Sequence, residues 1–234
     1  MAKKLVRSNL SEDAYLFLRD LFINGKRYNP GDKISVEELS RELGVSRTPL
    51  WGAINRLEAE GIVEIAPRLG VYLINYDPQR IVDIYLAREA LEGMAARVAA
   101  EKITDHDIDV LRANLVLQRK LLRENKFDAY HVVAIEFHEH IVRTTQNKTL
   151  QRLLESIFAQ IRAMRVQRSS QPTRLPQSCD DHDEILKALE KRKPELAERV
   201  MRDHIRDLTM VLREDVETAE PAAKASSRRA SLRA

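Results

Sequence analysis

The chain has 234 residues, 44% of them hydrophobic and 32% charged, which is enough to bury a core in one or two domains. Only 5% are aromatic, and the 7 glycines and 8 prolines favour long helices over a β-sandwich or barrel. A net charge of +3 points only weakly to nucleic acid, so such a function must rest on the placement of individual arginines. The single cysteine, Cys179, excludes an internal disulfide, and no apolar run is long enough to cross a membrane. We therefore expect a soluble cytoplasmic protein.

The N-terminal third combines helical periodicity with turn signals. Apolar spacing predicts three helices, over 9–24, 36–43 and 47–60. Ser35 and Glu38 form a capping box at the start of the second helix, and Gly44 ends it, because the residue after a helix often needs left-handed backbone. Two β-branched runs, 62–66 and 71–74, then predict a hairpin.

This order of elements predicts a winged helix-turn-helix that binds duplex DNA. The second helix of such a motif enters the major groove by its N-terminus, where free N–H groups also favour phosphate. An arginine there can pair with guanine O6 and N7. The predicted DNA-contacting residues lie on this helix and at the hairpin tip: Ser46, Arg47, Thr48, Trp51, Arg56, Arg68 and Gly70. The alternative, a plain helical hairpin with Gly44 as an ordinary cap, does not account for the β-hairpin that follows.

From Asp77 onward the pattern is helical. Asp77 is a predicted N-cap and Pro78 occupies the first turn, where its missing N–H costs nothing. Thr104 and Pro194 mark two further helix starts. The predicted helices span 78–100, 105–124, 127–145, 148–170, 180–190 and 194–216, with a loop over 171–177. The fold class is mainly α: a winged helix-turn-helix over 9–76, an all-α helical bundle over 77–216 and a disordered tail over 217–234.

Residues 9–76 resemble the DNA-binding domain of GntR-type bacterial transcription regulators. The resemblance is carried by Leu43–Leu50, Leu57–Ile62 and Pro67–Val71, following Pro30-Gly31 and Leu39. The family usually has Arg-Glu where this chain has Trp51-Gly52, and that arginine is a common operator contact in the family. Trp51 therefore either packs against DNA or is buried elsewhere. Gly52 early in a helix costs about 1 kcal/mol relative to Ala.

Residues 77–216 resemble the helical effector domain, called FCD, of one branch of that family. The matching residues are Arg88–Glu92, Phe137-His138 and His182–Glu184. The resemblance implies that the helical domain binds a small organic acid. A homodimer is expected because one DNA-binding domain contacts only a half-site. Arg88, Arg165 and Ala134 are the residues expected at the effector, although an inward arginine can equally form a structural salt bridge.

Three histidines are the strongest feature of this half. His138, His182 and His204 are separated by 44 and 22 residues, the pattern of metal-binding members of the family. Those members carry an Asp four residues before the first His, where this chain has Ala134. His131 cannot replace it, because seven residues of helix span about 10.5 Å. Three imidazoles suit a divalent ion of the zinc or nickel type, completed by water or an effector carboxylate. The alternative is a metal-free pocket whose histidines contact the effector or each other.

The sequence thus predicts a ligand-responsive transcription regulator, not an enzyme, with an operator and a small-molecule effector as partners and no membrane. A second hypothesis makes the metal ion itself the effector. A remote third is a metal-dependent hydrolase of the His-Asp kind, in which the winged domain would have no role.

Overall fold

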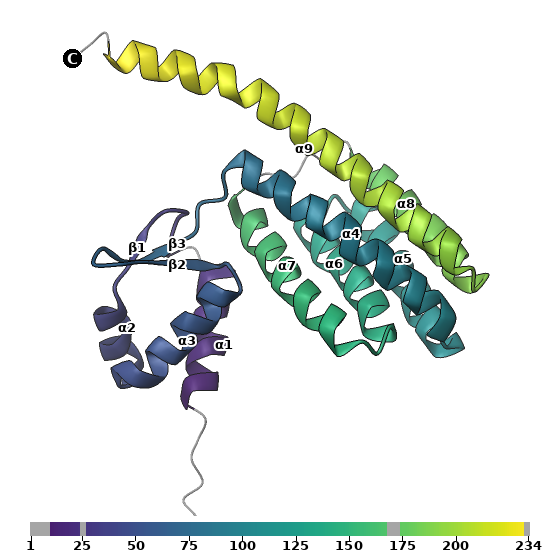
Figure 1. Cartoon of the computed structure of the whole chain (residues 1–234), viewed down its shortest axis with the longest axis horizontal. Coiled ribbons are helices and arrows are strands. Elements are labelled where there is room, and N and C mark those ends of the chain that lie inside the picture. The colour runs from purple at the N-terminus through teal and green to yellow at the C-terminus, as the bar shows by residue number, and fades with distance from the viewer. Residues whose placement is uncertain (1–9, 24–26, 168–173, 232–234) are drawn as a thin grey trace, which may run out of the picture. The chain divides into compact units, whose positions relative to one another are not determined.

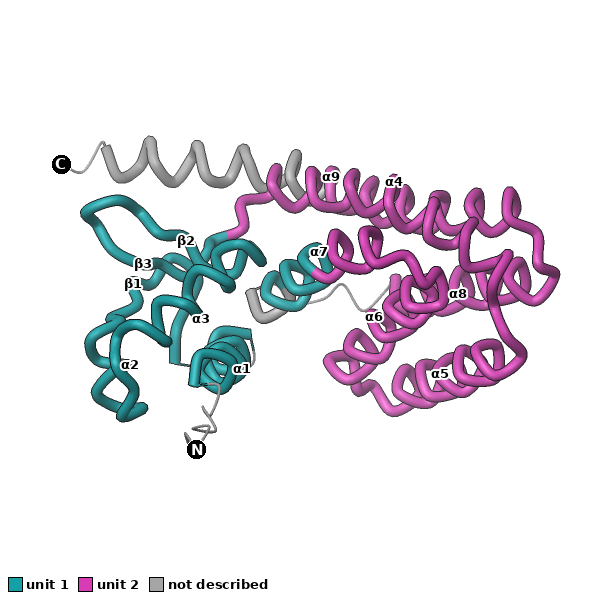
Figure 2. Tube along the Cα trace, turned by 60° about the horizontal axis from the view of Figure 1, so that its bottom comes forward, with its two compact units in different colours: residues 1–75, 156–169 teal, residues 76–155, 170–234 magenta. Residues whose placement is uncertain are grey.

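The computed structural model describes residues 10–23, 27–167 and 174–231, with side chains for all of these except 165–167 and 214–231. Contacts divide the chain into two compact units, drawn in teal and magenta in Figure 2. The first comprises residues 1–75 with 156–169, and the second 76–155 with 170–234. The sequence analysis had placed 156–169 in the helical domain. Residues 156–169 group with the first unit partly because the Gln160 side chain packs closely on Gly61, where a Cβ would lie 2.8 Å from Gln160 Cδ.

The first unit contains α1 (Leu10–Ile23), α2 (Val36–Leu43), α3 (Arg47–Ala59) and a small antiparallel sheet (Figure 1). The strands are β1 (Lys33–Ile34), β2 (Val63–Ala66) and β3 (Gly70–Leu73), in the order β1-β3-β2. The predicted hairpin is confirmed, with Ile65 opposite Val71. The two residues of β1 are too few for any periodicity, so this strand was not predicted.

The turn between α2 and α3 follows the sequence prediction. Gly44 has φ +62, the left-handed conformation expected after a helix. The Ser35 hydroxyl accepts a hydrogen bond from the Glu38 N–H at 3.2 Å, and Ser40 Oγ donates to the Val45 carbonyl at 2.6 Å. These local contacts set the direction in which α3 starts.

A compact core holds the first unit together. Its most buried side chains come from all three helices and the start of the hairpin: Leu18, Leu39, Leu50, Ile54, Leu57 and Ile62. Gly52 has a clear packing role, because a Cβ there would lie 2.8 Å from Ser11 Oγ. Ser11 in turn donates to the Pro49 carbonyl at 3.4 Å. The unfavourable helix propensity of Gly52 is thus offset by close approach of α1 and α3.

The second unit is helical throughout its described residues. It contains α4 (Pro78–Lys102), α5 (Asp105–Arg123), α6 (Phe127–Thr144), the first half of α7 (Lys148–Gln167), α8 (Leu175–Glu190) and α9 (Pro194–Ser231). Asp77 caps α4 by accepting from the Arg80 N–H at 2.9 Å. Thr104 and Asp107 form a reciprocal capping box on α5. These predicted helix starts are confirmed.

Two boundaries differ from the prediction. α8 begins at Leu175 rather than 180, because Pro176 lies in the first turn, where a missing N–H is tolerated. α9 continues to Ser231, through most of the segment predicted as a disordered tail. That prediction rested on the lack of an apolar period. Such a period indicates that one face of a helix is buried, and a helix rich in Ala, Lys and Arg can form without one. Residues 232–234 lie outside the described part of the chain.

α4 and α9 run side by side (Figure 1) and make the most extensive helix contact of the unit. Gly93 permits it, since a Cβ there would lie 2.6 Å from Arg202 Cγ. The core beneath them gathers side chains from several helices, among them Leu111, Leu115, Tyr130, Phe137, Ile185 and Met201. Among the described residues, no helix is both long and apolar enough to span a membrane.

Candidate nucleic-acid interface and metal centre

The N-terminus of α3 presents the predicted reading residues to solvent. Ser46, Arg47 and Thr48 are all exposed, and the Ser46 side chain makes no capping hydrogen bond to its own helix. Arg47 Nη2 lies 3.5 Å from Glu37 Oε1, but both side chains are about two-thirds exposed. An ion pair so exposed contributes little, so Arg47 remains available to another partner.

Trp51 lies on the outer surface of α3. The residue is 37% exposed, so it is not part of the core. Of the two alternatives for Trp51, packing against DNA and burial in the protein, burial is therefore excluded. Asn55, also exposed, follows one turn later. Thr48, Trp51 and Asn55 have the i, i+3, i+7 spacing of one helix face. The sequence analysis did not single out Asn55, although this spacing could have identified it.

Arg56 is placed differently from the other predicted DNA contacts. Its guanidinium lies 3.5 Å from the centre of the Tyr15 ring and pairs with Glu12 at 2.8 Å and Glu60 at 3.5 Å. Tyr15 donates to Glu60 at 2.7 Å, and burial with that hydrogen bond raises the pKa of Tyr15 to about 12. The structure therefore joins Arg56 to α1 rather than to Arg47 and Thr48.

The hairpin tip is shaped for close approach to a surface. Arg68 is exposed with φ +66, and Gly70 has φ +123, a conformation open to glycine. A Cβ on Gly70 would lie 2.9 Å from Lys33 Cε. Lys33, on β1, therefore adds a cation beside the hairpin, which is the wing of the winged helix-turn-helix. Neither Lys33 nor its strand was predicted from the sequence.

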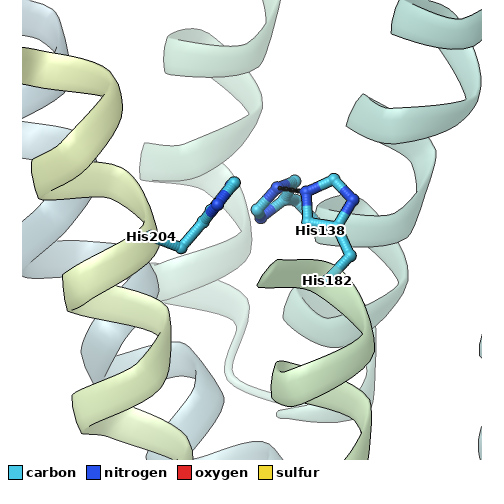
Figure 3. Close-up of side chains that lie close together, drawn as sticks. All are labelled: His138, His182 and His204. Atoms are coloured by element: carbon cyan, nitrogen blue, oxygen red, sulfur yellow. Dashed lines mark hydrogen bonds between the residues drawn. The ribbon is translucent and has the colours of Figure 1, made fainter. Parts of the chain in front are cut away.

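In the helical unit, three helices direct one histidine each toward a common point (Figure 3). His138 comes from α6, His182 from α8 and His204 from α9, and all three are buried. Their nitrogen ligand atoms lie within 4.8 Å of one another, with His138 Nε2 and His182 Nε2 3.0 Å apart. Phe137 stacks on the His182 ring with centroids 4.8 Å apart. The three-histidine set predicted from spacing is therefore brought together.

An acceptor lies at the outer nitrogen of each ring. Glu92 Oε2 is 2.5 Å from His138 Nδ1, Gln118 Oε1 is 2.8 Å from His182 Nδ1, and Asp181 Oδ2 is 3.1 Å from His204 Nδ1. The contacts of His182 and His204 are hydrogen bonds, which favour the proton on Nδ1 and leave the Nε2 lone pair facing inward. The His138–Glu92 contact does not have hydrogen-bond geometry. Sequence reasoning did not assign these three residues a role.

Burial sets the charge state of the cluster. Desolvation lowers the pKa of all three imidazoles below the ordinary value for histidine, most strongly for His138 and His182. For His204 the hydrogen bond to Asp181 opposes this lowering. The pKa of Asp181 falls because its hydrogen bonds with His204 and Gln177 outweigh its own burial. The rings are therefore neutral near pH 7, the form that ligates metal.

Arg88, a predicted effector contact, already has a partner. It is buried on α4 and its Nε donates to Glu92, four residues on. Burial raises the pKa of Glu92, and the Arg88 guanidinium opposes that rise. Because arginine stays charged, its buried charge favours an ionised Glu92 beside it. Ala134 is buried in the helical core, and the side chain of Arg165 lies outside the described ones.

The donor set fits a divalent ion. His204 Nε2 is buried and has no hydrogen-bond partner among the described residues, which is unfavourable for a nitrogen in a dry interior. His138 Nε2 and His182 Nε2 are hydrogen-bonded to each other, and an ion bound by all three rings would replace that bond and give His204 Nε2 a partner. Three nitrogen ligands, two of them with hydrogen-bonded outer nitrogens, are the donor chemistry that zinc-type ions use.

The His-Asp hydrolase hypothesis finds no geometric support. Asp183, next to His182, contacts Arg119 at 2.6 Å and Lys187 at 2.9 Å instead of the histidine cluster. Hydrogen bonds with those two cations lower the pKa of Asp183, as expected for a surface ion pair. The carboxylate that such chemistry needs beside the metal is directed elsewhere.

Comparisons with known proteins also give two regions, but the second includes residues 156–169, which belong to the first compact unit in the structure. Residues 10–73 match the model of the gntR family of bacterial regulatory proteins, and residues 83–207 match that of the FCD domain. The chain is 34% identical over 140 residues to the Nta operon transcriptional regulator of Aminobacter aminovorans, covering 59% of this chain and 65% of that one. It is 29% identical over 213 residues to the Exu regulon transcriptional regulator of Escherichia coli, covering 79% and 78%.

Solved structures share the fold. The Escherichia coli protein McbR/YncC superposes with a TM-score of 0.73 at 19% identity, over 92% of this chain and 99% of that one. A GntR regulator from Rhodococcus sp. RHA1 gives a TM-score of 0.71 at 18% identity, over 88% and 98%. The families matched and the relatives named are transcriptional regulators and not enzymes. Both family models match, and the FCD match alone spans more than half of this chain. The chain therefore belongs to the GntR family of bacterial transcriptional regulators, in the branch that carries an FCD domain.

Proposed function

We propose that this regulator binds a two-fold operator through α3 and the wing, and that an effector in the helical unit changes that binding. The observation that carries the proposal is the buried cluster of His138, His182 and His204, in which the outer nitrogens of His182 and His204 are hydrogen-bonded to acceptors. A site so arranged inside a DNA-binding regulator is suited to sensing and not to turnover.

A divalent ion of the zinc or nickel type is the proposed resident of the cluster. Such an ion would supply a Lewis-acidic centre able to take a carboxylate of the effector. The chain's own residues hold the three imidazoles neutral and turned inward. Ala134 contributes no ligand, so the ion would keep a position for water or effector.

A second candidate cation for an acidic effector is Arg174, which was not predicted from the sequence. Its Nε and Nη2 are buried, with no hydrogen-bond partner among the described residues. Nη2 lies 3.9 Å from Asp181, the residue that accepts from His204, and 4.0 Å from Asp207. Arg88 Nε, by contrast, donates a hydrogen bond to Glu92. We infer that Arg174 rather than Arg88 pairs with the effector's charge.

A homodimer is the proposed assembly, because one winged helix-turn-helix contacts only half of a two-fold operator. This predicts that operator affinity falls when the protein is diluted below its dimer dissociation constant. Analytical ultracentrifugation beside fluorescence anisotropy would test it. Equal operator affinity for monomer and dimer would contradict the proposal.

The DNA-binding proposal is tested with duplexes selected by the protein from a random pool, titrated by anisotropy at fixed salt. Arg47→Ala should lose about 1–3 kcal/mol of binding free energy, the range for one bidentate arginine–guanine pair. The control is Arg123→Ala, an exposed arginine of α5 in the other unit. Equal affinity for wild type and Arg47→Ala would remove Arg47 from the reading set.

The same titration separates effector-sensing from metal-sensing. If zinc or nickel alone changes operator affinity relative to chelator-treated protein, the ion is the effector. If the ion alone leaves operator affinity unchanged, but a pool of small organic acids changes it only when the metal is present, the ion is part of the effector site. If neither changes operator affinity, the proposed regulation is wrong.

A further inference from the structure

The orientation of the His182 ring nitrogens depends on a chain of amides that begins at the backbone. Asn114 Nδ2 donates to the Val133 carbonyl at 3.0 Å. Gln118 Nε2 donates to Asn114 Oδ1 at 2.7 Å, and Gln118 Oε1 faces His182 Nδ1 at 2.8 Å. Gln118 is fully buried, so water cannot replace these partners.

The polarity of this chain is fixed at its first member. A backbone carbonyl can only accept, so Asn114 must present its NH₂ to Val133 and its oxygen to Gln118. Gln118 must then donate to Asn114 and present its own oxygen to His182. Since that oxygen accepts, the proton of a neutral His182 lies on Nδ1 and the Nε2 lone pair points at the other two rings.

An amide free to rotate would have the opposite effect. If Gln118 presented its NH₂ to His182 Nδ1, the proton would move to Nε2. That N–H would then occupy the direction in which an ion must approach. Each partner that holds the amide in one orientation therefore favours ligation by His182.

We propose that Asn114 and Gln118 are positioning residues that hold His182 in its Nδ1–H tautomer, so that Nε2 is always available as a ligand. This rests on the proposed metal site and deepens it, because it assigns the control of one ligand to two uncharged side chains of α5. Glu92 and Asp181, which are acidic residues, lie at the other two rings, whereas the amide chain adds no charge to the buried site.

The test uses the full-length, chelator-treated protein labelled with ¹⁵N at histidine. Long-range ¹H–¹⁵N spectra distinguish a protonated ring nitrogen from one with a lone pair. Wild type should show His182 as the Nδ1–H tautomer. Gln118→Met, which keeps the length of the side chain but not its acceptor, should shift His182 toward Nε2–H. Gln118→Glu, which keeps an acceptor, should retain Nδ1–H.

Asn114→Ala provides a second variant at a half-buried position, should Gln118→Met fail to fold. It frees the Gln118 amide to rotate, so His182 should become a mixture of tautomers. Gln79→Met, an exposed glutamine of α4, is the matched control and should leave the His182 spectrum unchanged. A wild-type His182 protonated on Nε2, or an unchanged tautomer in both Gln118→Met and Asn114→Ala, would overturn the proposal.

Zinc affinity, measured by competition with a fluorescent chelator, gives an independent readout. Gln118→Met should bind zinc about 10–100-fold more weakly than wild type, the usual effect of losing an outer partner of a ligand. Affinity equal to wild type would contradict the positioning role. If wild type itself binds no zinc, the proposed metal site fails, while the spectra still decide whether the amide chain sets the tautomer.

Discussion

Arg47 and Arg56 lie on the same helix, nine residues or about 2.5 turns apart, and their surroundings assign them different roles. Arg47 is exposed beside a weak ion pair, whereas Arg56 is stacked on Tyr15 and paired with two carboxylates. Both were predicted to contact DNA. Residue type and helix position alone did not separate them, because the partners of Arg56 come from α1 and the end of α3.

Trp51 gives the sharpest prediction at this scale. It is exposed on the outer face of α3, and an apolar ring in the major groove can contact the thymine methyl group. Replacing thymine with deoxyuracil at the contacted position should therefore weaken wild-type binding but not binding by Trp51→Ala. Anisotropy with duplexes in which one thymine at a time is replaced checks this. Unchanged affinity of the wild-type protein for every substituted duplex would contradict the prediction.

The buried histidines predict a dependence of stability on pH. Burial lowers the pKa of His138, His182 and His204 in the folded protein, while in the unfolded chain they titrate near the ordinary value of about 6.5. Below that pH the unfolded chain takes up protons that the folded protein does not, so the free energy of unfolding should fall from pH 7 to pH 5.5. Each histidine contributes up to about 1.4 kcal/mol per pH unit.

Urea denaturation of chelator-treated protein at several pH values measures this loss. His106→Gln is the control, because His106 is exposed and its removal should leave the pH dependence unchanged. A free energy of unfolding that stays constant from pH 7 to pH 5.5 would show that the cluster is already protonated or not buried in solution.

At the scale of elements, the turn between α2 and α3 depends on one glycine. Gly44 has φ +62 and nothing within 4 Å of the position where a Cβ would stand. Gly44→Ala should therefore destabilise the protein through backbone strain alone, by about 1–2 kcal/mol. Gly44→Asn should cost less, because asparagine tolerates the left-handed region. Denaturation midpoints of the two variants check the order, and equal midpoints would contradict this account.

Gly52 and Gly93 act between elements instead of within a turn. Each lies where another helix approaches, Gly52 against Ser11 and Gly93 against Arg202. Helix propensity alone predicts that Gly52 destabilises α3 and gives no reason for a glycine there. The packing of α1 on α3 supplies the reason, since a Cβ would meet a side chain from the neighbouring helix.

At the scale of the whole molecule, regulation requires coupling between the histidine cluster and the operator. Linkage makes any such coupling reciprocal: if zinc changes operator affinity by some factor, operator must change zinc affinity by the same factor. Anisotropy with and without zinc, beside chelator competition with and without operator, measures both factors. If the change in operator affinity and the change in zinc affinity differ at equilibrium, zinc either acts at a site other than the one measured by chelator competition or changes the oligomeric state.

What the sequence determined by itself was mostly local. Capping boxes, a left-handed glycine and period-2 or helical spacing depend on neighbours along the chain, so α2, α3, the hairpin and most helix starts were predicted. The resemblance and the spacing of three histidines also pointed to His138, His182 and His204, which the structure brings together. Even the Arg88–Glu92 pair carried a signal, the i, i+4 spacing of oppositely charged residues on a helix.

Only the tertiary structure decided which side chains meet between helices. Gln118 reaches His182 from another helix, and Asp181 pairs with His204, 23 residues away, rather than with its neighbour His182. Periodicity gives the face of a helix but not its partner, because the partner depends on how helices cross and rotate against each other. For the same reason Arg56 joined α1, Arg174 came to lie beside Asp181, and the two-residue strand β1 formed only by pairing with β3.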